Sequence, residues 1–217
     1  MNTEQARFNM IEQQIRPWDV LDQQVLDLLM TTPRELFVPE RYQSLAFTDT
    51  QIDIGHNQTM MAPKEEARML QALKIKPTDS VLEIGTGSGF VTALLAKQAK
   101  NVFSTDIIPD FVTESQKKLS HLGINNVNCE VADAASGWEY QAPYDVIVIT
   151  GSLINLPDSF KNSLKIGGRL FCVLGEAPAM SATLFSKTNE NEWYQTDMYE
   201  TYVAPLINAP KKERFVF

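Results

Sequence analysis

Apolar positions in the first 45 residues recur at helical spacing. Four apolar side chains form one predicted stripe of the first helix: Phe8, Ile11, Ile15 and Trp18. Pro17 is expected to end that helix, because proline lacks a backbone donor. A second helix is predicted to begin at Asp22, a residue type that suits the N-cap position. Residues 46–63 contain polar and glycine positions and are expected to form a long loop.

From residue 64 the pattern changes, because short apolar runs now alternate with amphipathic segments. Helices are predicted over residues 65–73, 89–100, 109–122 and 156–164. Buried strands are predicted over residues 80–84, 101–105, 127–131, 145–150 and 169–174. Two further strands, 182–187 and 194–202, flank a polar turn and are predicted to form an antiparallel hairpin. Strands that alternate with helices indicate an α/β fold with a mostly parallel sheet.

The composition limits the partners of the chain. Its formal net charge is −8, so nucleic acids and anionic membrane surfaces would repel it. Cys129 and Cys172 fall on predicted strands that are not neighbours, and both are expected to be buried, reduced thiols. With two histidines and no Cys-x-x-Cys motif, no metal site is expected. The N-terminus has no apolar signal segment and no stretch is long enough to span a membrane, which predicts a cytoplasmic protein.

The predicted strand 80–84 runs directly into three alternating glycines, Gly85, Gly87 and Gly89. Glycines let the backbone turn sharply and approach a ligand closely, and the ligand would lie beyond the carboxyl end of the strand. The glycine spacing does not fit a dinucleotide fingerprint, and the Gly-Lys-Ser/Thr of a phosphate loop is missing. Glu83 would repel a pyrophosphate but suits a cation. The pattern predicts a site for S-adenosylmethionine, which carries an ammonium and a sulfonium; a tight turn without a ligand is the alternative.

Two acidic residues at strand ends extend this prediction. Asp106 ends the second strand about 20 residues after Gly85, the offset at which a carboxylate binds ribose hydroxyls. Asp133 follows the third strand, where it is expected to accept a hydrogen bond from an adenine amino group. The alternatives are a helix cap for Asp106 and a turn residue for Asp133. The predicted cofactor site comprises Glu83, Gly85, Thr86, Gly87, Ser88, Gly89, Asp106, Ile107, Asp133 and Ala134.

With these residues assembled, the chain resembles the protein-L-isoaspartate O-methyltransferase family over most of its length. The segments that carry the resemblance are Thr32-Pro-Arg-Glu-Leu-Phe-Val-Pro-Glu40, Leu82-Glu-Ile-Gly-Thr-Gly-Ser-Gly89, Ala142-Pro-Tyr-Asp145 and Leu164-Lys-Ile-Gly-Gly-Arg-Leu170. The resemblance implies a seven-stranded Rossmann-like fold, S-adenosylmethionine as cofactor, and methylation of isoaspartyl carboxylates in damaged proteins. It implies a helical segment with an acceptor-side loop, residues 1–63, and a cofactor-binding core, residues 64–217, within one structural domain.

One segment departs from the family pattern. The family has a loop of the form Gly-x-Gly-Gln-Thr-Ile-Ser-x-Pro, whose serine is tied to catalysis, whereas this chain has Gly55-His-Asn-Gln-Thr-Met-Met-Ala-Pro63. Met61 stands at the serine position, while Gln58 and Thr59 match. We therefore predict an intact cofactor site, an acceptor site that contains Gln58, Thr59 and Met61, and weak or absent methylation of isoaspartyl peptides.

Three functions are compatible with this sequence. The first is isoaspartyl carboxyl methylation, in which the ionised acceptor needs no strong general base and the rate depends on alignment. The second is methylation of another acceptor, a small molecule included, because Met60 and Met61 offer adaptable apolar surface. In that case His56 is either a base for the acceptor or a surface residue. The third is a cofactor-binding module that regulates a partner without chemistry.

Overall fold

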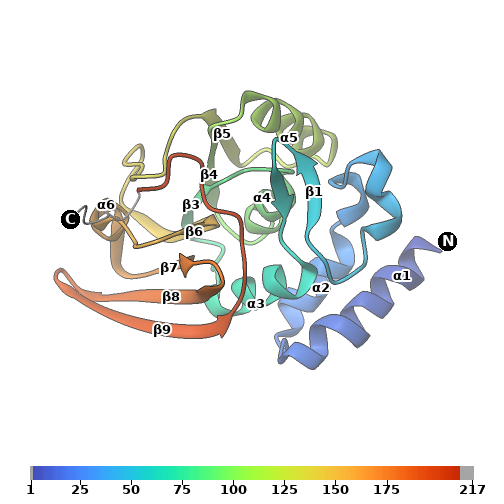
Figure 1. Ribbon diagram of the computed structural model, residues 1–217, viewed down its shortest axis with the longest axis horizontal. Coiled ribbons are helices and arrows are strands. Elements are labelled where there is room, and N and C mark those ends of the chain that lie inside the picture. Colours follow the sequence, from blue (N-terminus) through green and yellow to red (C-terminus); the bar gives the residue numbers. More distant parts are fainter. Residues whose placement is uncertain (1, 211–217) are drawn as a thin grey trace, which may run out of the picture.

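The computed structural model describes residues 2–210 and contains a seven-stranded sheet with the order β5-β4-β3-β6-β7-β8-β9 (Figure 1). The parallel strands are β3 (Ser80–Ile84), β4 (Asn101–Asp106), β5 (Val127–Val131), β6 (Tyr144–Leu153) and β7 (Leu164–Glu176). Two antiparallel strands follow, β8 (Ala179–Asn189) and β9 (Glu192–Glu200). The predicted α/β fold, with a mostly parallel sheet and a late antiparallel hairpin, is confirmed.

Helices alternate with the parallel strands, as predicted. They are α3 (Pro63–Leu73), α4 (Phe90–Ala96), α5 (Pro109–His121) and α6 (Asp158–Asn162). Helix α4 ends earlier than the predicted range 89–100, because residues 97–100 form a turn that leads directly into β4. The other helix bounds differ from the predictions by two residues or fewer, which is the usual uncertainty at helix ends.

The strands of the sheet point their side chains alternately into two apolar layers. In β6, Val146 and Val148 face the layer that contains the helices α2 to α5. Ile147 and Ile149 face the other layer, which includes Phe160 of α6. Because successive side chains of a strand point to opposite faces, a strand buried on both faces appears in the sequence as a continuous apolar run. This is why short apolar runs located the parallel strands.

The N-terminal segment is helical, but its predicted apolar stripe is only half correct. Ile11 and Ile15 are buried, whereas Phe8 is 47% exposed and Trp18 is 43% exposed. The reason is a change of helix type: α1 (Thr3–Met10) continues into a π-helical turn, η1 (Ile11–Ile15), and a 3-10 turn, η2 (Arg16–Trp18). These turns have different periods, so side chains spaced for an α-helix do not share one face.

The second helix begins where the sequence predicts. Helix α2 (Gln23–Thr31) is capped by Asp22, whose carboxylate accepts a hydrogen bond from the Gln24 N–H at 2.9 Å. Two 3-10 turns follow, η3 (Arg34–Leu36) and η4 (Glu40–Leu45). They lead the chain towards the carboxyl edge of the sheet (Figure 1).

The prediction that residues 46–63 form a long loop is wrong. They contain an antiparallel hairpin of β1 (Ile52–Gly55) and β2 (Gln58–Met60). Its strands are too short, and its register too irregular, to produce an alternating pattern. The hairpin turns at His56 and Asn57, which both have the left-handed conformation that asparagine tolerates better than most residues. The acceptor-side residues of the sequence therefore lie on an ordered element.

The two cysteines have the predicted placement. Cys129 lies on β5 and Cys172 on β7; these strands are not neighbours, and both thiols are buried and free. Burial raises the pKa of the Cys129 thiol to about 12 and also raises that of Cys172. Within residues 2–210, no helix has both the length and the apolar character needed to cross a membrane.

Candidate functional site

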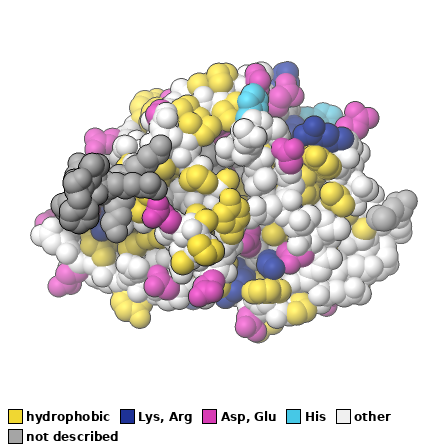
Figure 2. Space-filling view, in the orientation of Figure 1, with side chains coloured by type: hydrophobic (Ala, Val, Ile, Leu, Met, Phe, Trp, Pro, Cys, Tyr) yellow, Lys and Arg dark blue, Asp and Glu magenta, His cyan; other side chains and the backbone are white. Residues whose placement is uncertain are grey.

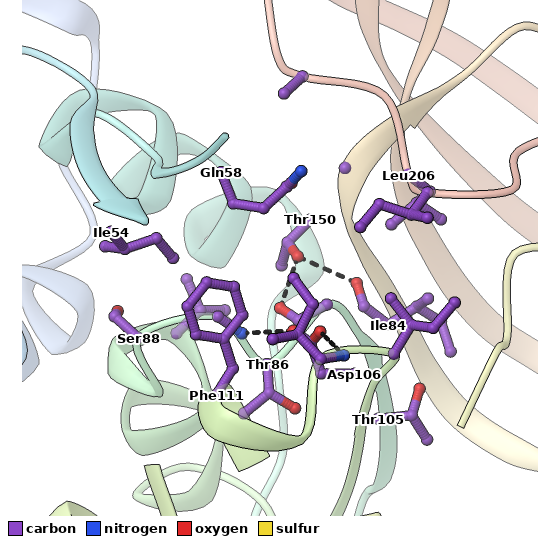
Figure 3. A pocket seen from close by; sticks show the side chains of 18 of the residues that line it. Ile54, Gln58, Ile84, Thr86, Ser88, Thr105, Asp106, Phe111, Thr150 and Leu206 are labelled. Carbon is purple, nitrogen blue, oxygen red and sulfur yellow. Dashed lines mark hydrogen bonds between the residues drawn. The ribbon is translucent and has the colours of Figure 1, made fainter. Parts of the chain in front are cut away.

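A cleft opens at the carboxyl ends of β3, β4 and β6 (Figure 3). The chain leaves β3 towards β4 and β5 and later returns to the other side of β3 as β6, so this edge is the topological switch point of the sheet. The volume of the cleft is about 860 Å³, including the space open to solvent at its mouth. Two segments outside the sheet complete its walls: the β1–β2 hairpin and residues 201–208, here called the strap, which follow β9.

The glycine loop forms the floor of this cleft. Gly85 has a φ of +98°, in the region that favours glycine, and its N–H donates to the Thr105 carbonyl at 2.8 Å. The Thr150 hydroxyl donates to the Gly85 carbonyl at 2.7 Å. A Cβ atom at Gly85 would lie 2.3 Å from the Thr150 Oγ1 atom, so no other residue fits here without a shift. The predicted turn after β3 is therefore present, and hydrogen bonds to β4 and β6 hold it in place.

Asp106 lies at the end of β4 and lines the cleft, as predicted. Its Oδ2 atom accepts a hydrogen bond from the Gly87 N–H at 2.8 Å, and its Oδ1 atom accepts one from the Ile108 N–H at 2.9 Å. Burial raises the pKa of this carboxyl, while these backbone donors oppose the shift. Helix α5 has Ile108 as its N-cap and no side-chain cap. Asp106 therefore ties the glycine loop to β4 and is not the cap of α5.

Asp133 also lines the cleft, and it connects the cleft to the strap. Its Oδ1 atom accepts a hydrogen bond from the Ala135 N–H at 3.2 Å, and its Oδ2 atom accepts one from the Asn208 side-chain amide at 2.8 Å. The strap is held on the sheet by Ser152, whose hydroxyl donates to the Val203 carbonyl at 2.8 Å. The side chain of Asp133 thus has a fixed orientation at the wall of the cleft.

The hairpin brings the predicted acceptor residues to the opposite wall. Gln58, Thr59 and Met61 all line the cleft, together with Ile54. In Figure 3, Ile54 and Gln58 lie on the hairpin side of the cavity, and Thr86 and Ser88 lie on the other side. Met61 is almost fully buried, so its thioether forms part of the wall. The structure therefore places the acceptor residues and the cofactor residues of the sequence analysis around one cavity.

A buried ion pair fixes the position of Met61. The guanidinium of Arg34 contacts the Glu66 carboxylate, donates to the Met61 carbonyl at 2.8 Å and donates to the Ala46 carbonyl at 3.0 Å. The side chains of Arg34 and Glu66 are both 1% exposed, and the Arg34 guanidinium lies over the Phe90 ring. Burial raises the pKa of Glu66, and the attraction of Arg34 opposes this shift. Arg34 belongs to the Pro-Arg-Glu segment of the sequence analysis, which here acts as the support of the acceptor wall.

Two predicted cofactor residues do not line the cleft. Glu83 is fully buried beneath the loop, where its Oε2 atom accepts hydrogen bonds from the hydroxyls of Thr92 and Ser104, both at 2.6 Å. Its carboxyl therefore does not face a ligand directly, because residue 83 points into the apolar layer beneath α4. Gly89 has a φ of +85°, and a Cβ there would lie 2.7 Å from the Ser115 Cβ atom. Gly89 allows α4 to pack closely against α5. The other eight predicted cofactor residues line the cleft.

Glu83→Gln is expected to make stability less dependent on pH. Burial raises the pKa of Glu83 from 4.5 to about 8, so the folded protein keeps a proton that the unfolded chain releases above pH 4.5. The free energy of unfolding therefore falls as the pH rises through this interval and levels off above it. Glutamine stays neutral, so the Tm of the variant should fall less than that of the parent between pH 5 and pH 8.

The difference in pH dependence of the Tm between the parent and Glu83→Gln reports on Glu83 alone. Glu66 also has a raised pKa, but it changes the stability of both proteins in the same way. Thermal unfolding followed by circular dichroism at several pH values measures this difference. Equal slopes of Tm against pH would show that Glu83 is ionised in the folded protein.

Several residues of the cleft were not anticipated from the sequence. They include Glu66. An acidic residue in the first turn of a helix is normally explained by its favourable interaction with the helix dipole, so it does not indicate a binding site. They also include Phe111, which reads as a core residue of α5, and the strap residues Val203 and Leu206. The strap has no regular secondary structure, so no periodic signal exists for it.

The charge of the cleft is one-sided. Among its lining residues, all within the described part of the chain, Glu66, Asp106 and Asp133 are acidic and none is basic. Figure 2 shows apolar side chains gathered at the centre of the face shown, with acidic side chains spread around them. The strap contributes exposed apolar surface through Tyr202 and Ile207. The cleft favours a cationic, partly apolar ligand over a phosphate-bearing one.

Comparisons with known proteins agree with this geometry. The family model of protein-L-isoaspartate(D-aspartate) O-methyltransferases matches residues 5–211. A protein-L-isoaspartate O-methyltransferase of Geobacter metallireducens is 37% identical over 175 residues, which cover 81% of this chain and 81% of the relative. Protein-L-isoaspartate O-methyltransferase 1 of Rhodopseudomonas palustris is 37% identical over 202 residues, 93% of this chain and 82% of the relative.

Solved structures show the same fold. A protein-L-isoaspartate O-methyltransferase of Plasmodium falciparum, solved in complex with S-adenosyl-L-homocysteine, superimposes with a TM-score of 0.80 at 20% identity. The match covers 95% of this chain and 99% of that structure's chain. The extent of the family match and the identity to its members establish that this chain belongs to the protein-L-isoaspartate(D-aspartate) O-methyltransferase family.

Proposed function

We propose that this protein transfers the methyl group of S-adenosylmethionine to the carboxylate of isoaspartyl residues in proteins. The observation that carries the proposal is the single cavity in which the hairpin residues Gln58, Thr59 and Met61 face the glycine loop and Asp106. Membership of the family supports both the cofactor and the protein acceptor. The two buried, free thiols support a cytoplasmic location, where thiols stay reduced.

The residues of the cleft fit S-adenosylmethionine. Its positive charge matches Asp106 and Asp133, since no residue of the described lining is basic and Glu66 is already paired with Arg34. Asp106 would hold the ribose hydroxyls at the end of β4, and Asp133 would accept from the adenine amino group. A Cβ atom at Gly87 would lie 3.3 Å from the Ile54 Cδ1 atom of the opposite wall, so glycine keeps this part of the cleft open. The cofactor supplies an activated methyl group attached to a sulfonium.

The chain's own contribution to the reaction is alignment and exclusion of water. A carboxylate acceptor is ionised at neutral pH, so it needs no general base. Gln58 and Thr59 are the hairpin side chains with hydrogen-bond donors that line the cleft, and they would orient the acceptor oxygen. Met61 supplies no donor, because a thioether only accepts weakly. The hairpin and the strap cover the cavity from two sides and limit the access of water.

Met61→Ser is expected to raise turnover of an isoaspartyl peptide by about 10- to 100-fold over a slow parent. A carboxylate against Met61 lacks one hydrogen-bond partner, which costs about 1–3 kcal/mol, and each 1.4 kcal/mol changes the rate about tenfold. The Met61 backbone is held by Arg34, so the substitution should not move the hairpin. Release of S-adenosylhomocysteine is measured for both proteins with the isoaspartyl peptide and with a matched aspartyl peptide.

Met60→Ser serves as the control, since Met60 is the neighbouring thioether of the same wall. Turnover that depends on the isoaspartyl bond in either the parent or Met61→Ser supports the proposed function. Cofactor binding without turnover in both proteins would argue against it. Rapid turnover by the parent would show that Gln58, Thr59 or backbone groups suffice for orientation.

One observation favours a second acceptor class. The acceptor wall combines two methionines with the Glu66 carboxyl and contains no basic residue to attract an anion. A neutral, partly apolar acceptor would meet no repulsion there. Turnover with such small molecules, and none with isoaspartyl peptides, would identify this second function.

A further inference from the structure

A second cavity lies beside the cleft, on another side of α3. It is lined by Trp18, Lys64, Glu65, Arg68, Tyr199, Glu200 and Thr201. Lys64 and Glu65 precede Arg68 by four and three residues and lie on the same side of the helix as Arg68, whereas Glu66 lines the main cleft. The strap passes from one cavity to the other, since Thr201 lines the second cavity and Val203 lines the cleft. Figure 2 shows basic side chains gathered over α3 among acidic ones.

Arg68 differs from the other arginines of the described chain. Five arginines form ion pairs with carboxylates: Arg7, Arg16, Arg34, Arg41 and Arg169. Within residues 2–210, Arg68 has neither an ion pair nor a hydrogen bond; its guanidinium lies over the Tyr199 ring, 4.0 Å from the centroid. A guanidinium has five donors in a planar fork that matches a carboxylate. The stacking holds this fork in place while its donors stay available.

The rest of the cavity supports the same ligand chemistry. The Tyr199 hydroxyl is buried and has no partner in the described chain. The Lys64 ammonium lies over the Trp18 ring at 4.2 Å and pairs with Asp49, so its charge is compensated, and Arg68 is the unpaired cation of this cavity within residues 2–210. Of the two lining carboxylates, Glu65 is engaged by the Thr201 hydroxyl and the Ala62 N–H, and Glu200 is exposed. Arg68 and Tyr199 thus line one cavity, and within residues 2–210 neither the guanidinium nor the buried phenol hydroxyl has a hydrogen-bond partner.

We propose that Arg68 and Tyr199, with Lys64 and Trp18 beside them, form a second binding site that takes one carboxylate side chain of the acceptor polypeptide. This inference deepens the proposed function and rests on it for the identity of the acceptor. The two cavities are separated by one helix, about 10 Å across, and an extended chain advances about 3.3 Å per residue. The bound acidic residue therefore lies about two to four residues from the methylated one.

The test measures peptide binding to the protein loaded with S-adenosylhomocysteine. Dye-labelled isoaspartyl peptides carry glutamate three residues before or three residues after the isoaspartyl residue, and matched peptides carry glutamine there. Fluorescence anisotropy gives the dissociation constants. We expect the parent to bind one glutamate peptide about 5- to 30-fold more tightly than its glutamine partner. Arg68→Gln should reduce this ratio to about one, with unchanged affinity for S-adenosylhomocysteine.

Arg41→Gln is the matched control, because Arg41 also lies over a tyrosine ring, that of Tyr42, but is paired with Asp53. This variant should keep the parent's ratio. A parent without preference for glutamate, or a preference that survives in Arg68→Gln, would overturn the proposal. Peptides with an ordinary aspartyl residue distinguish the second binding site from the proposed function. If the protein prefers glutamate peptides equally with isoaspartyl and aspartyl residues, and methylates neither, the binding site is supported and the proposed function is rejected. If glutamate and glutamine isoaspartyl peptides are methylated with equal KM, only the binding site is rejected.

Discussion

Arg34→Ala is expected to lower the free energy of unfolding by about 3–5 kcal/mol, the usual cost of removing one partner from a buried ion pair. The substitution leaves the Glu66 carboxyl buried without its cation. It also leaves the carbonyls of Met61 and Ala46 without the donors that Arg34 supplies. Urea unfolding followed by tryptophan fluorescence or circular dichroism measures the change.

Arg7→Ala is the comparison, because the Arg7–Glu35 pair links the same N-terminal region but is partly exposed. Its loss should cost roughly 1 kcal/mol. The double variant Arg34→Met with Glu66→Met should recover part of the stability, since a buried pair is often replaced by apolar residues at little cost. Equal losses in Arg34→Ala and Arg7→Ala would mean that the Glu66 site is hydrated or relaxes.

Asp106→Ala is expected to weaken binding of S-adenosylhomocysteine by about 5- to 150-fold, which corresponds to about 1–3 kcal/mol. The variant loses the carboxylate proposed to bind the ribose. It also releases the Gly87 N–H and the Ile108 N–H, which the two oxygens of Asp106 hold. The glycine loop therefore becomes less ordered in the same step. Isothermal titration calorimetry gives the dissociation constant.

Asp158→Ala is the control, since Asp158 is an exposed acidic residue of α6 that does not line the cleft. It should bind the ligand as the parent does. Asp106→Asn separates the two roles of the side chain, because an amide keeps one acceptor oxygen but loses the charge. If Asp106→Ala binds as tightly as the parent, the carboxylate is only a structural link between β4 and the loop.

The parallel core was predictable because its strands are buried on both faces. The predicted ranges 80–84 and 127–131 coincide with β3 and β5. The glycine loop was also predictable, since a strand, alternating glycines and a helix follow one another without interruption. Asp106 and Asp133 were located by their places at strand ends, which the topology brings to one edge of the sheet.

Other features depend on contacts between distant segments, which no local pattern records. Trp18 fits the predicted apolar stripe, but its ring lies outside the core. It is covered by Lys64, which is 46 residues later in the sequence. Glu83 adjoins the glycine loop, yet strand alternation turns its side chain towards Thr92 and Ser104. Glu66 lines the cleft and pairs with Arg34, which comes from the distant 3-10 turn η3. These positions require the tertiary structure.

The strap has a consequence for how the cleft comes into existence. Its walls come from the β1–β2 hairpin, near the beginning of the chain, and from Val203 to Ile207, which follow β9. During synthesis the glycine loop is translated long before the strap. Full affinity for the proposed cofactor therefore appears only after β9 and the strap have been translated and Asn208 has reached Asp133. Ligand binding thus reports that the whole sheet has assembled, and the bound ligand favours that assembled form by mass action.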